Sequence, residues 1–385
     1  MGKQGDRAVF VQLSSTCLSG ASLPPHFSAR ITYYSSTFVE THSRHRGNER
    51  FPMGIFSQIA VVLLREHRYR PITGSILSIG RQTVFLSPEE SVALVQHELG
   101  AETQQAADVE IDTLTRGSIR SRYITDRAFY SLFSNAQYHC LDVSSYEGAD
   151  LVADLCQPLP PSINERFDFI IDGSTLDNVF DPAMAIRNLA QLLKPGGRIL
   201  QFNHAARRHY VYVGFALCWF HDFYSINAFD DCQVYLAQWD EQRHRARWDF
   251  YHYEPMREED GKTSYFGEDR YYYPWRDALA VVIAEKGPNS TWTRSPIQFE
   301  YRNAITFEER DGTREIVRQT VPADIGDPYV ASALRFHRSR RPALFSPMEK
   351  VSIPSEFLHY SPETVYCGSL FPIDQHLRRR DRNAV

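Results

Sequence analysis

Between residues 71 and 287, short apolar runs alternate with longer stretches in which apolar residues recur at helical spacing. Strands separated by helices pair in parallel, because parallel neighbours need a long crossover connection. The pattern predicts an α/β fold: a doubly wound, mostly parallel seven-stranded sheet with helices between the first five strands. The expected strands are residues 75–79, 137–143, 150–154, 167–172, 198–203, 232–239 and 279–285.

Two of the expected helices have clear end signals. A proline and two glutamates at 88–90 suit the first turn of a helix that runs to Leu99, because the amide hydrogens there are unpaired and the dipole is positive. Residues 184–193 place apolar side chains on one helical side. The sequence KPGG at 194–197 should stop that helix, since proline cannot continue it and glycine adopts the left-handed turn.

Composition divides the chain into three regions. Residues 1–70 form an N-terminal extension with a helix expected at 53–67, and residues 71–287 form the core, with an insertion at about 101–136. Residues 288–385 form a C-terminal accessory region rich in proline, arginine and aromatic residues. The insertion contains the helix-like ITDRAFYSLF and either caps a site or decorates the fold.

Charge and hydropathy narrow the class of protein. A net charge of −5 gives no basic field for nucleic acid, so no nucleic-acid partner is expected. No apolar run reaches the roughly 18–20 residues of a membrane span, and no signal peptide is expected. The six cysteines lack metal-ligand spacing, and no metal site is expected. These features favour a cytoplasmic protein whose oligomeric state the sequence leaves open.

One ordered string carries a family resemblance. It reads FD-x-I-x-D at 167–172, L-x-x-V-x-D-P at 176–182 and LLKPGG at 192–197. The string resembles class I S-adenosyl-L-methionine (SAM)-dependent methyltransferases of the type 11-like group. The resemblance covers about residues 72–287 and is specific over 142–202. It implies the Rossmann-like methyltransferase fold with its last strand antiparallel, SAM as the cofactor, and O-methylation of a small molecule or a glycan precursor.

The loop after the first strand begins with Gly80 and Arg81. In the resembled family this loop is rich in glycine and wraps the methionine part of SAM, whereas here only Gly80 remains. Glycine permits a close approach of the backbone. Arg81 would pair with the methionine carboxylate through two parallel hydrogen bonds. The alternative is an arginine on the surface.

Acids at the ends of the next two strands are the other candidates for cofactor binding. Asp142 ends the second strand, where the resemblance implies that a carboxylate accepts from both ribose hydroxyls. Glu102 is the rival, because the insertion lengthens the connection. Asp154 ends the third strand and Leu155 follows it. The resemblance implies that the two residues contact adenine, with a structural turn as the alternative for Asp154.

Three residues are candidates for the transfer itself. Asp172 ends the fourth strand, where the resemblance places the sulfonium that its charge would stabilise. His204 and His209 follow the fifth strand, and histidine suits removal of a proton from a hydroxyl acceptor. The aromatic segment 210–224 is either an acceptor wall or core.

Two other functions remain open at this stage. A binding protein of the same fold without catalysis is favoured by the glycine-poor first loop and by Asn178, which cannot act as a base. An NAD(P)-dependent oxidoreductase is less favoured, because the chain lacks G-x-G-x-x-G after the first strand.

Overall fold

The computed structural model describes residues 54–100, 104–115, 118, 122–205, 211–239, 247–259, 262–265, 277–298, 305–310, 313–318, 328–339, 344 and 348–352. The chain divides into two compact units, Met1–Gly47 and Asn48–Val385, and every described residue belongs to the second. None of the helices in this part has the length and apolarity of a membrane span.

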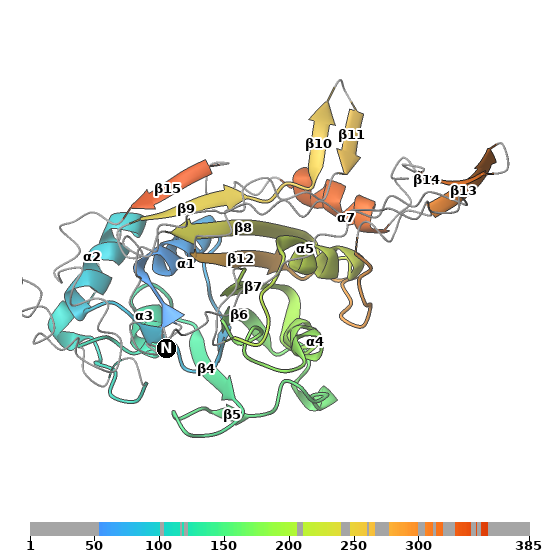
Figure 1. The fold of residues 1–385 in the computed structure, drawn as a ribbon. Coiled ribbons are helices and arrows are strands. Elements are labelled where there is room, and N and C mark those ends of the chain that lie inside the picture. Colours follow the sequence, from blue (N-terminus) through green and yellow to red (C-terminus); the bar gives the residue numbers. More distant parts are fainter. Residues whose placement is uncertain are drawn as a thin grey trace, which may run out of the picture. The chain divides into compact units, whose positions relative to one another are not determined.

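A nine-stranded sheet with the order β15-β9-β8-β12-β7-β6-β2-β4-β5 organises the described residues (Figure 1). The strands β5, β4, β2, β6 and β7 run parallel to one another. β12 lies between β7 and β8 and is antiparallel to both. The bounds are β2 (Ser75–Ile79), β4 (Gln137–Asp142), β5 (Leu151–Val152), β6 (Phe167–Gly173), β7 (Leu193–His204), β8 (Asp231–Trp239), β9 (Arg247–His252), β12 (Asp277–Glu285) and β15 (Met348–Ser352).

All seven predicted strands are present, and the predicted antiparallel last strand is confirmed in β12. The strand count was too low, because β9 and β15 extend the sheet beyond β8. The expected helix between the second and third strands is also wrong. Residues 143–150 form bends and turns, since a segment this short cannot hold a crossover helix. A 3₁₀ turn at Pro161–Ile163 takes the place of a helix before β6.

Helices cover both faces of the sheet, and smaller strands accompany it. The remaining elements are α1 (Ser57–Tyr69), α2 (Pro88–Leu99), a 3₁₀ turn at Ala106–Asp108, α3 (Asp126–Ser131), α4 (Pro182–Leu192), α5 (Leu217–Ile226), α7 (Pro328–His337), the parallel pair β1 (Gly54–Ile55) and β3 (Thr83–Val84), and the hairpins β10 (Met256–Glu259) with β11 (Lys262–Tyr265) and β13 (Ile305–Arg310) with β14 (Thr313–Arg318).

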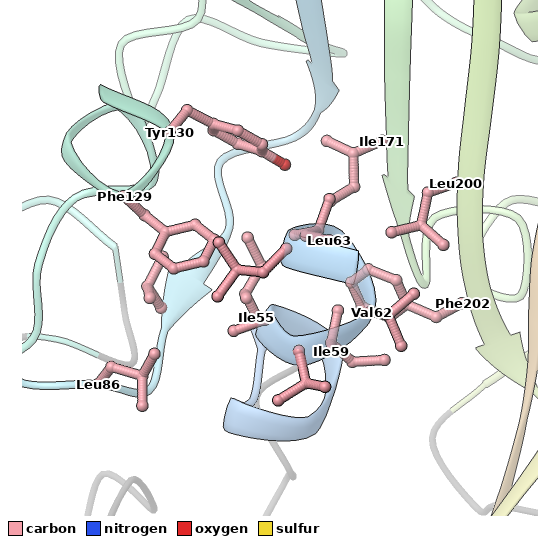
Figure 2. Packing of buried hydrophobic residues seen from close by; sticks show 14 of the residues in the cluster. Ile55, Ile59, Val62, Leu63, Leu86, Phe129, Tyr130, Ile171, Leu200 and Phe202 are labelled. Carbon is pink, nitrogen blue, oxygen red and sulfur yellow. The ribbon is translucent and has the colours of Figure 1, made fainter. Parts of the chain in front are cut away.

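Two apolar cores form because neighbouring residues of each strand point to opposite faces of the sheet. On one face α1 packs Ile59, Val62 and Leu63 among side chains of β6, β7 and α3 (Figure 2). On the other face α4, α5 and α7 cover the alternate residues of the same strands. Burial on both faces explains why the central strands read as continuous apolar runs.

The extensions contribute to this unit. α1, expected in the N-terminal extension, has a fully buried apolar side in the sheet core. α7 packs its Phe336 into the second core, and β15 pairs with β9. A division at residue 70 or 287 would separate elements that pack together. The region boundaries drawn from the sequence therefore stay predictions.

The sequence signals predicted both ends of α2 correctly, but they did not predict how α4 ends. Ser87 and Glu90 form a reciprocal capping box at the start of α2, and Gly100 ends it in the left-handed conformation. α4 ends at Leu192 without a glycine cap, because the following residues already belong to β7. The Nζ of Lys286 caps α4 instead, at 3.0 Å from the carbonyl oxygen of Ala190.

Candidate active site

The predicted site residues gather where β2, β4, β6 and β7 end. β2 pairs with β4 on one side and with β6 on the other, and the chain order reverses across β2. Open α/β sheets bind ligands in the crevice outside such a switch point. Gly80, Asp142, Asp172 and His204 all stand at this edge of the sheet.

Asp142 and Gly80 are neighbours across the ends of β4 and β2. The amide of Gly80 donates to the carbonyl oxygen of Leu141 at 2.7 Å. Gly80 adopts the left-handed conformation, with φ +67. A Cβ added to Gly80 would lie 3.4 Å from Oδ2 of Asp142. Oδ1 of Asp142 accepts from the amide of Ser144 at 3.2 Å. The half-exposed carboxylate thus stands over a backbone that a ligand can approach closely.

Arg81 has a protein carboxylate as its partner. Its Nε lies 2.9 Å and its Nη2 2.7 Å from Oδ1 of Asp126, the first residue of α3 in the insertion. Both side chains are buried. Burial lowers the pKa of Arg81, but Asp126 outweighs it and the pKa is raised overall. The predicted pairing with a ligand carboxylate stays a prediction, for which Asp126 is the competing anion.

Asp172 is fully buried at the end of β6. Burial raises its pKa to about 6, although hydrogen bonds from Asn203, Thr175 and Gln201 oppose the shift. The amide nitrogens of Asn203 and Gln201 lie 2.8 and 3.1 Å from Oδ2, and the backbone amide of Thr175 lies 2.9 Å from Oδ1. The carboxyl group is therefore held in one orientation, and its burial makes it a weaker acid than a free aspartate.

Asp177 holds His204 in place. Its Oδ2 lies 2.6 Å from Nδ1 of His204 and accepts from the backbone amide of the same residue at 2.8 Å. The hydroxyl of Ser174 and the side-chain amide of Asn178 donate to the carboxylate as well. With the proton on Nδ1 facing Asp177, Nε2 is the basic nitrogen of the imidazole.

Asp154 and Leu155 follow β5 as predicted, although β5 is shorter than expected. The exposed Asp154 accepts from the amide of Cys156 at 2.8 Å through Oδ1, which forms a side-chain turn. Leu155 is buried, and its carbonyl oxygen accepts from Asn188 at 2.8 Å. The turn accounts for one oxygen of Asp154, and the contact with adenine stays a prediction.

Two predicted residues, His209 and the rival acid Glu102, lie outside the described residues. The described part of the segment 210–224 is mostly core: Phe215, Phe220, Phe223 and Tyr224 are buried. Tyr212 is an exposed aromatic residue in this segment, with 73% of its surface accessible. It makes an edge-on contact with Phe180, which is exposed as well.

Sequence reasoning missed the partners that fix these residues. Asp177 had no predicted role in the site, yet this residue lies three positions beyond Ser174 and its carboxylate reaches His204 on the adjacent strand. No local pattern links Asp126 with Arg81, which lies 45 residues earlier. Within the described residues no cluster of three or more His, Cys, Asp or Glu side chains could hold a metal ion.

Comparisons with known proteins give likenesses of structure at low sequence identity. No protein-family model and no curated protein sequence matches the chain. A 1,6-didemethyltoxoflavin-N1-methyltransferase from Burkholderia thailandensis is 11% identical; the match covers 60% of this chain and 78% of that chain, with a TM-score of 0.32. Phosphoethanolamine N-methyltransferase 2 from Haemonchus contortus is 13% identical over 63% of this chain and 55% of its own, with a TM-score of 0.33.

The strand order itself gives the fold class. Five parallel strands place the switch point beside β2, and the antiparallel β12 is inserted between β7 and β8. The described part of the chain therefore has the Rossmann-like fold of class I SAM-dependent methyltransferases.

Proposed function

We propose that this chain binds SAM at the switch point and methylates a hydroxyl group of a small molecule or a glycan precursor. The observation that carries the proposal is the position of Asp142. Its carboxylate stands against Gly80 at the edge of the sheet where ligands of this fold bind. A carboxylate there can accept from two neighbouring hydroxyl groups, as a ribose offers.

Each site residue has a role that its surroundings support. Asp142 would hold the ribose, and Asp154 with the backbone of Leu155 would hold adenine. SAM supplies a methyl group on a positively charged sulfonium. Asp172 stays in one orientation through its three hydrogen bonds and carries a negative charge above its pKa of about 6. This charge favours a cation at the end of β6.

His204 is the candidate base for the acceptor. Asp177 fixes the imidazole from two sides, through Nδ1 and through the backbone amide of the same residue. Nε2 is then the nitrogen that takes a proton from a hydroxyl group as the bond to carbon forms. The protein otherwise contributes alignment of donor and acceptor.

A second function has an observation in its favour. Arg81 and Gln82 stand where the resembled family has glycine, Gln82 is buried, and Arg81 is already paired with Asp126. A protein that has kept the fold and lost transfer would tolerate these changes. The methyltransferase would transfer the methyl group to an acceptor, whereas the binding protein would bind SAM without transfer.

Thermal unfolding with S-adenosylhomocysteine (SAH), SAM and NADH tests both. A ligand at one hundred times its dissociation constant stabilises the folded chain by about 2.7 kcal/mol. SAH should therefore raise the melting temperature by several degrees. A rise with NADH and none with SAH or SAM would refute the proposal. A rise with SAH and no methyl transfer from labelled SAM to any hydroxylated acceptor would favour the binding protein.

A further inference from the structure

Phe180 and Tyr212 form an aromatic pair on the surface. Their side chains are 87% and 73% exposed, and their ring centroids lie 6.2 Å apart at an interplanar angle of 84°. Phe180 lies between β6 and α4, whereas Tyr212 lies between β7 and α5. Single apolar residues on a surface need no explanation. Two large rings from separate segments that meet in the open indicate a binding surface.

Backbone hydrogen bonds hold Tyr212 beside Asp177 and His204. The carbonyl oxygen of Asp177 accepts from the amides of Tyr212 and Val213 at 2.8 and 3.2 Å. Three residues after Tyr212, the amide of Phe215 donates to the carbonyl oxygen of His204 at 2.8 Å. The segment that carries Tyr212 therefore runs along the two residues that make up the candidate base.

Asn178 connects the aromatic pair with the candidate base. This exposed residue lies two positions before Phe180, and its Nδ2 donates to Oδ1 of Asp177 at 2.8 Å. The carboxylate of Asp177 is buried, and its Oδ2 lies 2.6 Å from Nδ1 of His204. The aromatic pair thus adjoins the surface next to the candidate base, at the carboxyl end of β6, where ligands of this fold bind.

The chemistry of these groups favours one class of acceptor. Two rings at nearly a right angle offer a face and an edge to a third planar ring. A free imidazole has a pKa of about 6.5 and a phenol one of about 10, whereas a hydroxyl group of an alcohol lies closer to the value of roughly 15.7 for water. An imidazole is therefore a better matched base for a phenol than for a sugar hydroxyl.

We propose that Phe180 and Tyr212 bind the aromatic ring of a phenolic acceptor, which makes the substrate a planar aromatic hydroxyl compound. The inference rests on the proposed function and narrows it to one class of small molecule. In the transfer the phenolic O–H bond breaks, and its proton goes to Nε2 of His204. The oxygen forms a bond to the methyl carbon as the C–S bond of SAM breaks, and the electron pair stays on sulfur, which gives SAH.

The test compares a planar acceptor with its saturated counterpart. 2-Naphthol carries its hydroxyl group on two fused aromatic rings, whereas decahydro-2-naphthol carries it on two fused saturated rings. Methyl α-glucoside represents the sugars. In the complex of the protein with SAH, the fluorescence of 2-naphthol measures its binding without transfer, and competition measures the other two compounds. Labelled SAM in place of SAH then measures transfer to each compound.

The variants Phe180→Ala and Tyr212→Ala each remove one ring of the aromatic pair. Tyr146→Ala is the control, because this tyrosine is 85% exposed on the loop after β4. Substitutions at such exposed positions should leave the melting temperature close to that of wild type. SAH affinity should therefore stay within about twofold of wild type in all three variants.

Wild type should bind 2-naphthol at least about tenfold more tightly than either of the other compounds. Phe180→Ala and Tyr212→Ala should each weaken 2-naphthol by about two- to tenfold, which is the contribution of one contact between aromatic rings. Tyr146→Ala should bind 2-naphthol as wild type does. Wild type should also transfer the methyl group of SAM to 2-naphthol and not to methyl α-glucoside.

Several results would overturn the inference. Equal affinity of wild type for the three compounds, or unchanged affinity of both variants for 2-naphthol, would show that the aromatic pair does not select the acceptor. Binding of 2-naphthol without methyl transfer would show that the bound phenol is not the acceptor. A changed oligomeric state of the double variant in light scattering would identify the pair as a contact between copies. Failure of wild type to bind SAH would refute the proposed function, whereas SAH binding without preference for 2-naphthol refutes this inference alone.

Discussion

The ion pair between Arg81 and Asp126 joins the first loop of the sheet to the insertion, and its removal should destabilise the fold. Nε of Arg81 lies 2.9 and 3.1 Å from the two oxygens of Asp126, and Nη2 lies 2.7 Å from one of them. The side chains are 9% and 0% exposed. Asp126 also accepts from the backbone amides of Gln82 and Arg127 and from the hydroxyl of Tyr138.

Arg81→Ala would leave the carboxylate of Asp126 buried without its cation. Breaking a buried pair on one side costs about 3–5 kcal/mol, because the remaining charge is uncompensated. The three remaining donors keep the expected loss near the lower figure, about 3 kcal/mol. Arg81→Lys keeps the charge without the planar fork and should lose less. The double variant with Asp126→Asn should lose less than the sum of the single variants, by about 0.5–3 kcal/mol.

Urea unfolding without ligand measures these differences for wild type, Arg81→Ala, Arg81→Lys, Asp126→Asn and the double variant. Arg127→Ala, one residue along α3, is the matched control, since its side chain is exposed and its contact with Asp150 spans 3.9 Å. A loss below about 1 kcal/mol in Arg81→Ala, or strict additivity in the cycle, would refute the reasoning. Loss of SAH affinity relative to 5′-methylthioadenosine in Arg81→Ala would instead support the sequence-based pairing with the methionine carboxylate.

Three further predictions concern the acids of the site. Asp142→Ala should weaken SAH by about 1.5–3 kcal/mol, roughly ten- to hundredfold by calorimetry, and unchanged affinity would move the ribose role to Glu102. Burial raises the pKa of Asp172 from 3.8 to about 6, so the folded state binds this proton more tightly than the unfolded state does. The contribution of this carboxyl group to the free energy of unfolding is therefore lost as the pH rises from 3.8 to about 6. The stability of Asp172→Asn relative to wild type should therefore rise by about 3 kcal/mol from pH 3.8 to pH 7 in urea unfolding, and parallel profiles would contradict this. Asp177→Asn should lower kcat by a factor of about 10²–10⁴ and leave the affinity for SAH unchanged. An equal loss of kcat and of SAH affinity would show that Asp177 has only a structural role.

The sheet could be predicted because local signals mark it. Apolar runs between turn residues gave β2 and α2 with their observed bounds, since Gly74, Gly80 and a capping box fix their ends. The start of β7 was missed by five residues, because KPGG pairs with the backbone of Lys286 from a distant strand. The extra strands β9 and β15 were missed for a similar reason, as each is defined by its partner in the sheet.

The candidate site could be predicted only to the level of strand ends. Asp142, Asp172 and His204 were placed correctly because each follows an apolar strand whose end the sequence marks. Their partners were not, since Asp126 and Asp177 make contacts that depend on how loops fold across the strand ends. Local sequence signals determine where a residue lies on a strand or loop, whereas tertiary packing determines which group its side chain contacts.

The glycine-poor first loop and the insertion are best understood as one change. After Gly80 the chain has two long side chains where the resembled family has glycine, and these diverge: Arg81 toward α3 and Gln82 toward β6. A buried guanidinium needs an anion, and Asp126 at the start of α3 supplies it. Without the insertion Arg81 would lose that partner, and without Gly173 the amide of Gln82 would have no room. Each unusual residue of the loop is thus matched by a residue elsewhere, so the first loop, the insertion and the end of β6 depend on one another for their packing.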